Sequence, residues 1–249
     1  MFNACIIIPV YNHEGAIEAT CTNVRPLGLP IILIDDGSHA PCAQLLDQLK
    51  QRENHYLVRL TRNCGKGAAV RAGLAEAERL GFTHALQIDA DGQHDVADLP
   101  PFLKSAQQFP EAMTIGYPCF DESVPRHRYY SRYITHVWVW INTLSLTIRD
   151  SMCGVRLYPL GALNRMLHRY SCGNRMEFDT EVLVRWYWRG GKINNLPVHV
   201  HYPLDGVSHF RLFRDNVLMA RMHLRLTVGM LLRAYRLYTR RTAERQHGS

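Results

Sequence analysis

The chain has 249 residues, enough for one domain with a substantial core, and a formal net charge of +7. Seven cysteines with irregular spacing argue against a disulfide framework and indicate a reducing compartment. The sequence contains no internal repeat, C-x-x-C pair or zinc-ligand spacing. It starts with a strand pattern instead of a secretory signal, so we expect a cytoplasmic protein.

Four apolar runs near the N-terminus predict buried strands, and each run ends in a polar or Gly-rich turn. The runs cover residues 4–10, 31–34, 56–60 and 85–88. Helical patterns follow from Ala16 and from Ala68 to Leu80. Uniformly apolar runs are typical of strands buried on both faces. The alternation of strand and helix predicts a parallel α/β sheet whose site lies at the carboxyl ends of the strands.

The turn after the fourth run carries two carboxylates, Asp89 and Asp91, followed by Gly92 and Gln93. Alternate residues of an extended strand share a face, so both carboxylates would point the same way, and Gly92 permits a sharp turn. Two carboxylates and an amide oxygen suit a hard cation such as Mg²⁺ or Mn²⁺ that also holds phosphates. An acidic β-turn without a metal is the alternative.

Four motifs, in this order and spacing, resemble the signatures of family 2 glycosyltransferases, and most closely those of dolichyl- or polyprenyl-phosphate sugar synthases. They are Ile8-Pro9-Val10-Tyr11-Asn12, Ile34-Asp35-Asp36-Gly37-Ser38, Gly65-Lys66-Gly67-Ala68-Ala69 and Asp89-Ala90-Asp91-Gly92-Gln93-His94. A weaker match continues through residues 151–158 and 178–181. The resemblance implies a GT-A fold over residues 1–205, a Rossmann-like, mostly parallel α/β sandwich. It also implies inverting sugar transfer from a nucleotide-diphospho-sugar.

The resemblance implies a donor site for a UDP- or GDP-linked sugar at the strand ends. Its residues would be Pro9, Tyr11, Asn12, Glu14, Asp36, Lys66, Gly67, Asp89 and Ala90. Asp36 could accept a hydrogen bond from the base or ribose, or cap its own turn. The family often has an acid directly after the Asn, whereas here His13 precedes Glu14. Gly67 and Lys66 could approach a phosphate at a helix start, or could form a tight turn.

The implied metal ligands are Asp91, Asp89 and Gln93, and the metal would neutralise the departing diphosphate. His209 lies in a polar segment before the terminal helix and is either a further ligand or a surface residue. Arg211 and Arg214, close to it in the chain, could hold phosphate oxygens.

Three acids, Glu177, Asp179 and Glu181, are candidates for a general base. Transfer to a neutral hydroxyl needs such a base, whereas a lipid phosphate is already anionic. Glu177 and Glu181 are four residues apart and would share a helix face, although acids near a helix N-terminus also suit the helix dipole. The resemblance points to Glu181 or Asp179, with Glu181 narrowly first. With Asp91, these two complete the set of catalytic candidates.

An aromatic-rich segment from Tyr129 to Ile148 falls short of a clean membrane span. In the lipid-phosphate enzymes that the chain resembles, this region holds the acceptor. Arg126, Arg128 and Arg132 could then bind the acceptor phosphate. A partly buried amphipathic helix is the alternative.

The segment 206–249 is predicted to be basic, amphipathic and helical over residues 216–238. From Asp205 onward the sequence has nine Arg and three acids. Six of the Arg fall within an arc of roughly 120° at the helical spacing of ~100° per residue: Arg214, Arg221, Arg225, Arg233, Arg236 and Arg240. This stripe predicts contact with anionic lipid headgroups, and packing on the catalytic domain is the competing interpretation. No nucleic-acid-binding module accompanies it, so no nucleic-acid partner is expected.

We therefore expect a glycosyltransferase bound peripherally to the cytoplasmic face of a membrane. It would use Mg²⁺ or Mn²⁺ and transfer a sugar to a polyprenyl phosphate or a lipid hydroxyl. Transfer to a soluble glycan or cell-wall polymer is one alternative. A catalytically silent relative that serves as a binding module in a membrane assembly is another. The sequence leaves the oligomeric state open, including a homo-oligomer.

Overall fold

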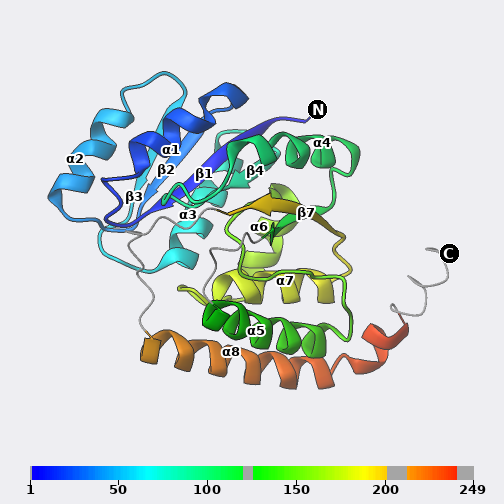
Figure 1. The fold of residues 1–249 in the computed structure, drawn as a ribbon. Helices are drawn as coiled ribbons and strands as arrows, with labels where there is room; N and C mark the ends of the chain where they lie inside the picture. The colour runs from blue at the N-terminus through cyan, green and yellow to red at the C-terminus, as the bar shows by residue number, and fades with distance from the viewer. Residues whose placement is uncertain (1, 120–125, 201–211, 240–249) are drawn as a thin grey trace.

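The structure, a computed structural model, describes residues 2–119, 126–200 and 212–239, without the side chains of residues 126–131 and 212. The described strands form one mixed sheet in the order β3-β2-β1-β4-β6-β5-β7 (Figure 1). The strands are β1 (Ala4–Val10), β2 (Ile31–Asp35), β3 (His55–Arg59), β4 (His84–Gln87), β5 (Met113–Cys119), β6 (Arg156–Pro159) and β7 (Ile193–His199).

Helices cover both faces of the sheet (Figure 1). They are α1 (Ile17–Val24), α2 (Ala40–Leu49), α3 (Lys66–Arg79), α4 (Pro100–Gln108), α5 (Arg126–Thr143), α6 (Leu160–Arg169), α7 (Phe178–Trp188) and α8 (Leu212–Leu231), with short 3₁₀ turns η1 (Arg25–Leu27) and η2 (Val96–Asp98). Helices α1, α2 and α4 enclose one apolar core against the sheet, while α3, α6 and α7 enclose the other. Helices α5 and α8 form a further layer beyond α7.

The half of the sheet that holds the sequence motifs is parallel. Strands β3, β2, β1 and β4 are neighbours with parallel register. The side chains of β1, β2 and β4 are largely buried, and those of β3 are mostly half-buried. Their bounds agree with the predicted runs to within one residue. The predicted α/β class with a mostly parallel sheet is therefore confirmed. Strand β6 was not predicted; it runs antiparallel to both β4 and β5, and its pairing places Arg156 opposite Gln87.

The C-terminal helical segment packs on the rest of the chain. Helix α8 lies along α5 and contacts α7, and Asn142 of α5 joins the three helices. Its side-chain Oδ1 accepts a hydrogen bond from the Thr227 hydroxyl (3.0 Å), and its carbonyl accepts one from Trp188 Nε1 (2.7 Å). In the described parts of the chain, no helix combines the length and the apolar composition needed to cross a bilayer.

Candidate active site

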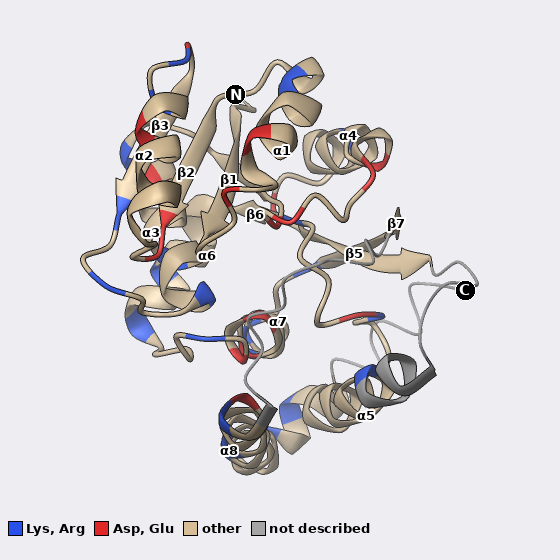
Figure 2. Ribbon diagram, turned by 60° about the vertical axis from the view of Figure 1, so that its left-hand side comes forward, with Lys and Arg blue, Asp and Glu red and all other residues tan. Residues whose placement is uncertain are grey.

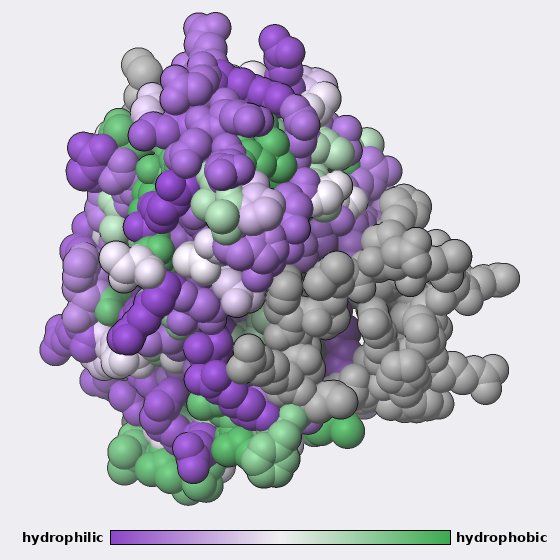
Figure 3. Space-filling view, turned by 90° about the vertical axis from the view of Figure 1, so that its left-hand side faces the viewer, coloured by the Kyte–Doolittle hydropathy of each residue, from purple (hydrophilic) through white to green (hydrophobic). Residues whose placement is uncertain are grey.

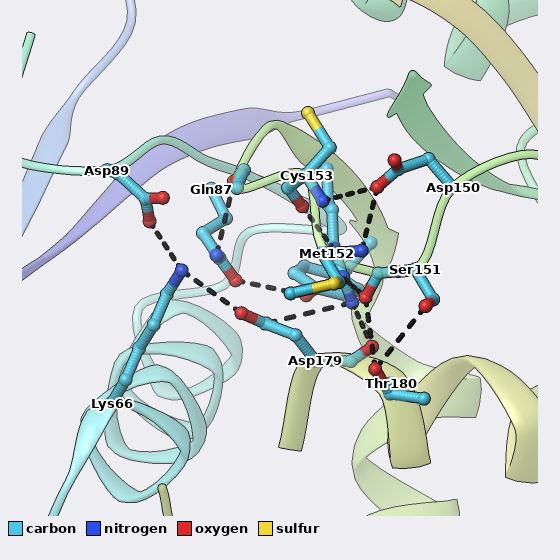
Figure 4. A network of polar contacts seen from close by, with 12 residues as sticks. Lys66, Gln87, Asp89, Asp150, Ser151, Met152, Cys153, Asp179 and Thr180 are labelled. Carbon is cyan, nitrogen blue, oxygen red and sulfur yellow. Dashed lines mark hydrogen bonds and ion pairs between the residues drawn. The ribbon is translucent and has the colours of Figure 1, made fainter. Parts of the chain in front are cut away.

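Three charged side chains, those of Lys66, Asp89 and Asp179, form a partly buried cluster at the carboxyl end of the parallel strands (Figure 4). Lys66 is the first residue of α3, Asp89 follows β4, and Asp179 lies in the first turn of α7. The Lys66 ammonium is 2.8 Å from Oδ1 of Asp89 and 3.0 Å from Oδ2 of Asp179. One cation therefore joins three elements, and all three residues are among the predicted site residues.

Electrostatic pairing keeps this cluster charged despite its burial. Burial opposes ionisation of Asp89, but the charges of Lys66, His94 and Arg156 together with the hydrogen bond from Lys66 outweigh it, so the pKa of Asp89 is lowered. Burial alone would lower the pKa of Lys66, whereas the charges of Asp179 and Asp89 raise it. The ion pair between Lys66 and Asp89 is therefore stabilised in its charged form.

Asp91 stands beside this cluster in a less favourable environment. Burial and the negative charge of Asp89 raise the pKa of Asp91. Gly92 has a φ of 69°, and the Gln93 N–H donates to Oδ1 of Asp91 (3.1 Å), so the predicted sharp turn forms. Strand β4 ends at Gln87, however. The two aspartates therefore lie in a turn, and the expectation that they share a face of an extended strand does not apply.

The oxygen-rich turn fits a hard divalent cation. A cation would relieve the repulsion between Asp89 and Asp91 that raises the pKa of Asp91. Mg²⁺ is commonly held by one or two carboxylates together with substrate phosphates and water. Within the described residues, no group of three or more His, Cys, Asp or Glu side chains is arranged as a metal site. The remaining predicted ligand, His209, lies outside the described residues.

Arg156 is a buried residue of the site that the sequence analysis did not identify. Its Nε and Nη2 donate to the carbonyls of Cys153 (2.9 Å) and Ser151 (2.8 Å). Its Nη1 donates to the Asp179 carbonyl (2.5 Å) and lies 3.7 Å from Oδ1 of the same residue. These bonds fix the loop before β6 against the start of α7 (Figure 4). An arginine within a short apolar run was the signal in the sequence, since such a residue is rarely buried without several partners.

Three glycines permit close packing around the cluster. A Cβ atom on Gly154 would overlap the Asp89 carboxylate, and one on Gly65 would overlap the Asn174 carbonyl. A Cβ atom on Gly67 would overlap the side chain of Phe178. Gly67 was predicted to admit a phosphate, with a tight turn as the alternative. In the structure, the Cα of Gly67 lies close to the Phe178 side chain, which agrees with the tight-turn alternative.

Asp36 caps the turn that leads into α3. Its Oδ1 accepts a hydrogen bond from the Cys64 N–H (2.7 Å), and its Oδ2 accepts from the Gly65 N–H (2.8 Å) and from Asn63 Nδ2 (3.0 Å). Burial raises the pKa of Asp36, and the two backbone bonds oppose this effect. Asp36 thus caps the turn of residues 63–65 and not its own turn, where Asp35 accepts the Ser38 N–H (2.8 Å). Contact of Asp36 with a nucleotide stays a prediction.

The loops after β1 and β2 are joined through Asn12. Its N–H donates to the Ser38 hydroxyl (3.1 Å), and its Oδ1 accepts from the His39 N–H (2.9 Å). Its φ of 53° is in the left-handed region that Asn tolerates. Glu14 is exposed and lies 3.4 Å from Nε2 of His39. Asn12 and Glu14, both predicted to bind the nucleotide sugar, therefore lie together in these loops. Among the described residues, their polar partners are Ser38 and His39.

The other predicted donor residues differ in accessibility. Pro9 and Tyr11 are half-buried. Ala90 is buried, and its carbonyl accepts a hydrogen bond from the Thr20 hydroxyl (3.2 Å). Its side chain is thus part of the core beneath the turn.

Both carboxylate oxygens of Glu181 accept hydrogen bonds from other residues of the protein. Its Oε1 accepts from Nε (2.8 Å) and Nη2 (2.7 Å) of Arg185. Its Oε2 accepts from Nη2 of Arg225 (2.8 Å) and the Gly173 N–H (2.8 Å). The residue is 0% exposed. This environment disagrees with ranking Glu181 first as a general base, because both oxygens are engaged. Asp179 is the candidate that the structure brings to the charged cluster.

Arg132 is also engaged within the protein. Its guanidinium donates to both oxygens of Asp150 (2.5 and 2.8 Å), which also accepts the N–H groups of Met152 (2.7 Å) and Cys153 (2.6 Å). His136 Nε2 lies 3.1 Å from the same carboxylate. The predicted phosphate ligand therefore ties α5 to the loop that Arg156 also holds.

The other predicted acceptor residues are only partly described. Arg126 and Arg128 lie in the first turn of α5, with their side chains outside the description. Arg211 lies outside the described residues.

Comparison with known proteins shows that this chain is similar to glycosyltransferases. Residues 5–175 match the family described as Glycosyl transferase family 2. A curated relative, the undecaprenyl-phosphate 4-deoxy-4-formamido-L-arabinose transferase of Pectobacterium carotovorum, is 37% identical over 71% of this chain and 54% of its own length. The dolichyl-phosphate beta-glucosyltransferase of Trichomonas vaginalis is 29% identical over 77% of this chain and 64% of its own length. The chain thus spans less than two thirds of either named transferase.

Two further similarities cover more of the chain. An uncharacterized protein of Methanocaldococcus jannaschii is 26% identical over 82% of this chain and 90% of its own length. The glucosyl-3-phosphoglycerate synthase of Mycobacterium tuberculosis, solved with Mn²⁺ and UDP-glucose, superposes with a TM-score of 0.67 at 13% identity, covering 92% of this chain and 79% of the synthase. This structural similarity shows that the chain has the GT-A fold. Together with the matched motifs and the charged cluster, the comparisons establish that this chain is an enzyme belonging to glycosyl transferase family 2.

Proposed function

We propose that the chain transfers a sugar, with inversion, from a nucleotide-diphospho-sugar to a polyprenyl phosphate at a membrane surface. The observation that carries the proposal is the link between the charged cluster and the outer helices. Arg156 donates hydrogen bonds to the Asp179 carbonyl and to the Cys153 carbonyl. The Cys153 N–H donates to the Asp150 carboxylate, and Arg132 of α5 donates to the same carboxylate. Helix α5 belongs to a pair of helices with an exposed apolar surface.

On the donor side, Lys66, Asp89 and Asp91 would hold the diphosphate end of the nucleotide sugar. Lys66 stays protonated because its carboxylate partners raise its pKa, and it supplies positive charge at the mouth of the site. A bound Mg²⁺ or Mn²⁺ would neutralise charge on the diphosphate and so stabilise it as a leaving group. Support for this choice comes from the oxygen-rich turn and from the glucosyl-3-phosphoglycerate synthase, which was solved in complex with Mn²⁺ and UDP-glucose.

On the acceptor side, an anionic phosphate oxygen would attack the anomeric carbon as the bond to the diphosphate breaks. The nucleoside diphosphate leaves with the bonding electrons. The phosphate needs no strong base, because it is already ionised. Asp179, held by Lys66 and Arg156, would orient the acceptor and would accept a proton only if the acceptor were a hydroxyl. Polyprenyl- and dolichyl-phosphate transferases among the relatives favour the phosphate acceptor.

We assign the lipid surface to the exposed apolar face of α5 and α8, here called the apolar face. It consists of Tyr133, Ile134, Val137, Trp138 and Ile141 of α5 together with Phe213, Leu224, Val228 and Leu231 of α8. Hydrophobic side chains gather at the lower end of the molecule, where α8 lies (Figure 3). Exposed Arg214 flanks the face and complements anionic headgroups.

This assignment modifies the predicted arginine stripe. Arg225 turns toward Glu181, and Arg233 lies over the Trp188 ring (4.9 Å) and donates to the Gly229 carbonyl (2.8 Å). In Figure 2, where α8 is seen nearly end-on, uncharged residues occupy its lower side. The apolar residues would therefore enter the bilayer surface while part of the stripe binds to α7.

The donor test is thermal stabilisation by UDP-, GDP- and CMP-linked sugars, each with Mn²⁺ or with EDTA. A metal-dependent shift with one nucleotide supports the donor site. No shift with any nucleotide sugar would overturn it and favour a silent binding module. Transfer assays with a short polyprenyl phosphate and with 3-phosphoglycerate then separate a lipid acceptor from a soluble one.

The membrane test is flotation with vesicles that contain anionic lipid. Leu224→Glu combined with Leu231→Glu should release the protein, because charge on the apolar face opposes insertion. Phe109→Glu is the matched control, since Phe109 is 54% exposed at the end of α4, remote from this face. Equal flotation of all three proteins would contradict the assignment.

A further inference from the structure

Glu181 and Arg225 connect the outer helix α8 to the interior of the site. The carboxylate of Glu181 is fully buried, whereas the Arg225 side chain is 56% exposed. Arg225 follows Leu224 of the apolar face along α8, and its Nη2 reaches Glu181 of α7 (2.8 Å). A buried carboxylate needs charged or hydrogen-bonding partners, and Arg185 and Arg225 provide them.

The same carboxylate holds the loop that precedes α7. Oε2 of Glu181 accepts the Gly173 N–H at 2.8 Å, so Arg225 and Gly173 share one oxygen. Any displacement of Arg225 therefore acts on the oxygen that fixes the start of the loop formed by residues 173–175. We call this segment the 173–175 loop.

The 173–175 loop in turn packs on the turn that presents Lys66. The Asn174 carbonyl accepts the Ala68 N–H (2.9 Å), and Nη1 of Arg175 donates to Oδ1 of Asn63 (3.2 Å). A Cβ atom on Gly65 would overlap the Asn174 carbonyl, so the two segments are in close contact. The position of the loop thus contributes to the position of the Lys66 ammonium.

We propose that Glu181 and Arg225 are positioning residues that couple the seating of α8 to the geometry of the donor site. Glu181 is not the proton acceptor in this assignment. It transmits the position of Arg225 through Gly173 to the turn around Lys66. The inference rests on the proposed function for its consequence, because a helix that docks on lipid would then help to order the site that binds the nucleotide sugar.

The test compares Arg225→Gln with Arg221→Gln in the full chain without vesicles. Both changes remove one exposed positive charge from α8, one turn apart, and Arg221 has no ion pair among the described residues. Arg225→Gln should fold, because Arg185 still pairs with Glu181. We expect it to raise the dissociation constant of the nucleotide sugar about tenfold, the range of a lost charged hydrogen bond. Arg221→Gln should leave that constant unchanged.

A second readout does not depend on the donor. Amide hydrogen exchange at Gly173 and Ala68 should quicken about tenfold in Arg225→Gln and stay at the wild-type rate in Arg221→Gln. Arg225→Lys, which keeps the charge, should restore part of both effects. Unchanged exchange in Arg225→Gln would overturn the coupling. Faster exchange in a protein that binds no nucleotide sugar would instead uphold the coupling and refute the proposed function.

Discussion

The Lys66 ammonium lies 2.8 Å from the Asp89 carboxylate, so the first residue of α3 is held across the strand ends by the turn after β4. Asp179 of α7 contacts the same ammonium. Asp179 is buried and Asp89 is partly buried, and this cation stabilises both, because a charge with little access to water is unfavourable without a partner. Lys66 therefore contributes both to stability and to the charge balance of the donor site.

Replacing Lys66 by Met should destabilise the protein by about 3 kcal/mol, because the buried Asp179 and the partly buried Asp89 lose their shared cation. Urea unfolding measures the change. The double variant Lys66→Met/Asp89→Asn should recover part of the loss, since it also removes one unpaired charge. Lys104→Met, at an exposed position of α4, is the control. Equal stability of Lys66→Met and this control would contradict the pairing.

Replacing Asp91 by Asn should separate function from stability. Burial and the charge of Asp89 raise the pKa of Asp91, so its ionised form is unfavourable in the folded chain. Asp91→Asn should therefore keep or raise the melting temperature while it abolishes Mn²⁺-dependent binding of the nucleotide sugar. Calorimetric titration with Mn²⁺ and with EDTA measures the binding, and Glu111→Gln controls for the lost charge. Metal-dependent binding that persists in Asp91→Asn would remove Asp91 from the site.

The sequence allowed the parallel half of the sheet to be predicted, and it placed Asp89 and Lys66 near the strand ends, because these signals are local. Each strand is a short apolar run, Asp89 directly follows one run, and Lys66 lies after the turn that follows another. Strand β6 was missed because its antiparallel pairing with β4 joins segments about 70 residues apart, a contact that local periodicity does not encode. Arg156 was overlooked with it.

The roles of Glu181 and of the arginine stripe depended on long-range partners as well. Helical spacing correctly groups Arg225 with the other arginines of α8, but its partner Glu181 is 44 residues away in sequence. The same ion pair occupies an oxygen of Glu181 that a general base would need to turn toward the acceptor. Tertiary partners distinguish Glu181 from Asp179, which is two residues earlier on the same helix: Arg225 of α8 bonds to Glu181, whereas Lys66 contacts Asp179.

Replacing Gly154 by Ala should disrupt the site without a change of charge. A methyl group at this position would overlap the Asp89 carboxylate, so Asp89 or the loop must move. We expect weaker binding of the nucleotide sugar and a stability loss of roughly 1–3 kcal/mol from overpacking. Gly161→Ala is the matched control, because its added Cβ meets no atom closer than 3.5 Å. Binding equal to that of the control would show that the carboxylate adapts without consequence.

Acidification should loosen the packing of α8 on α5 through His223. Burial lowers the pKa of His223 to about 4, and its Nδ1 lies 3.4 Å from Nδ2 of Asn142, a donor that suits the neutral ring. The unfolded chain binds a proton near pH 6.5, well above the folded pKa. Stability is therefore fully present above pH 6.5 and falls as the pH drops toward 4.

The contribution of His223 to this loss reaches on the order of 2 kcal/mol by pH 5. His223→Gln cannot take up the proton, so its stability should decline less than that of the wild type over the same range. Urea unfolding of both proteins from pH 7 to pH 4.5 isolates the difference, since every other titrating group is shared. Parallel curves would mean that His223 is protonated equally in the folded and unfolded states, and the buried contact with Asn142 would then not hold the ring neutral.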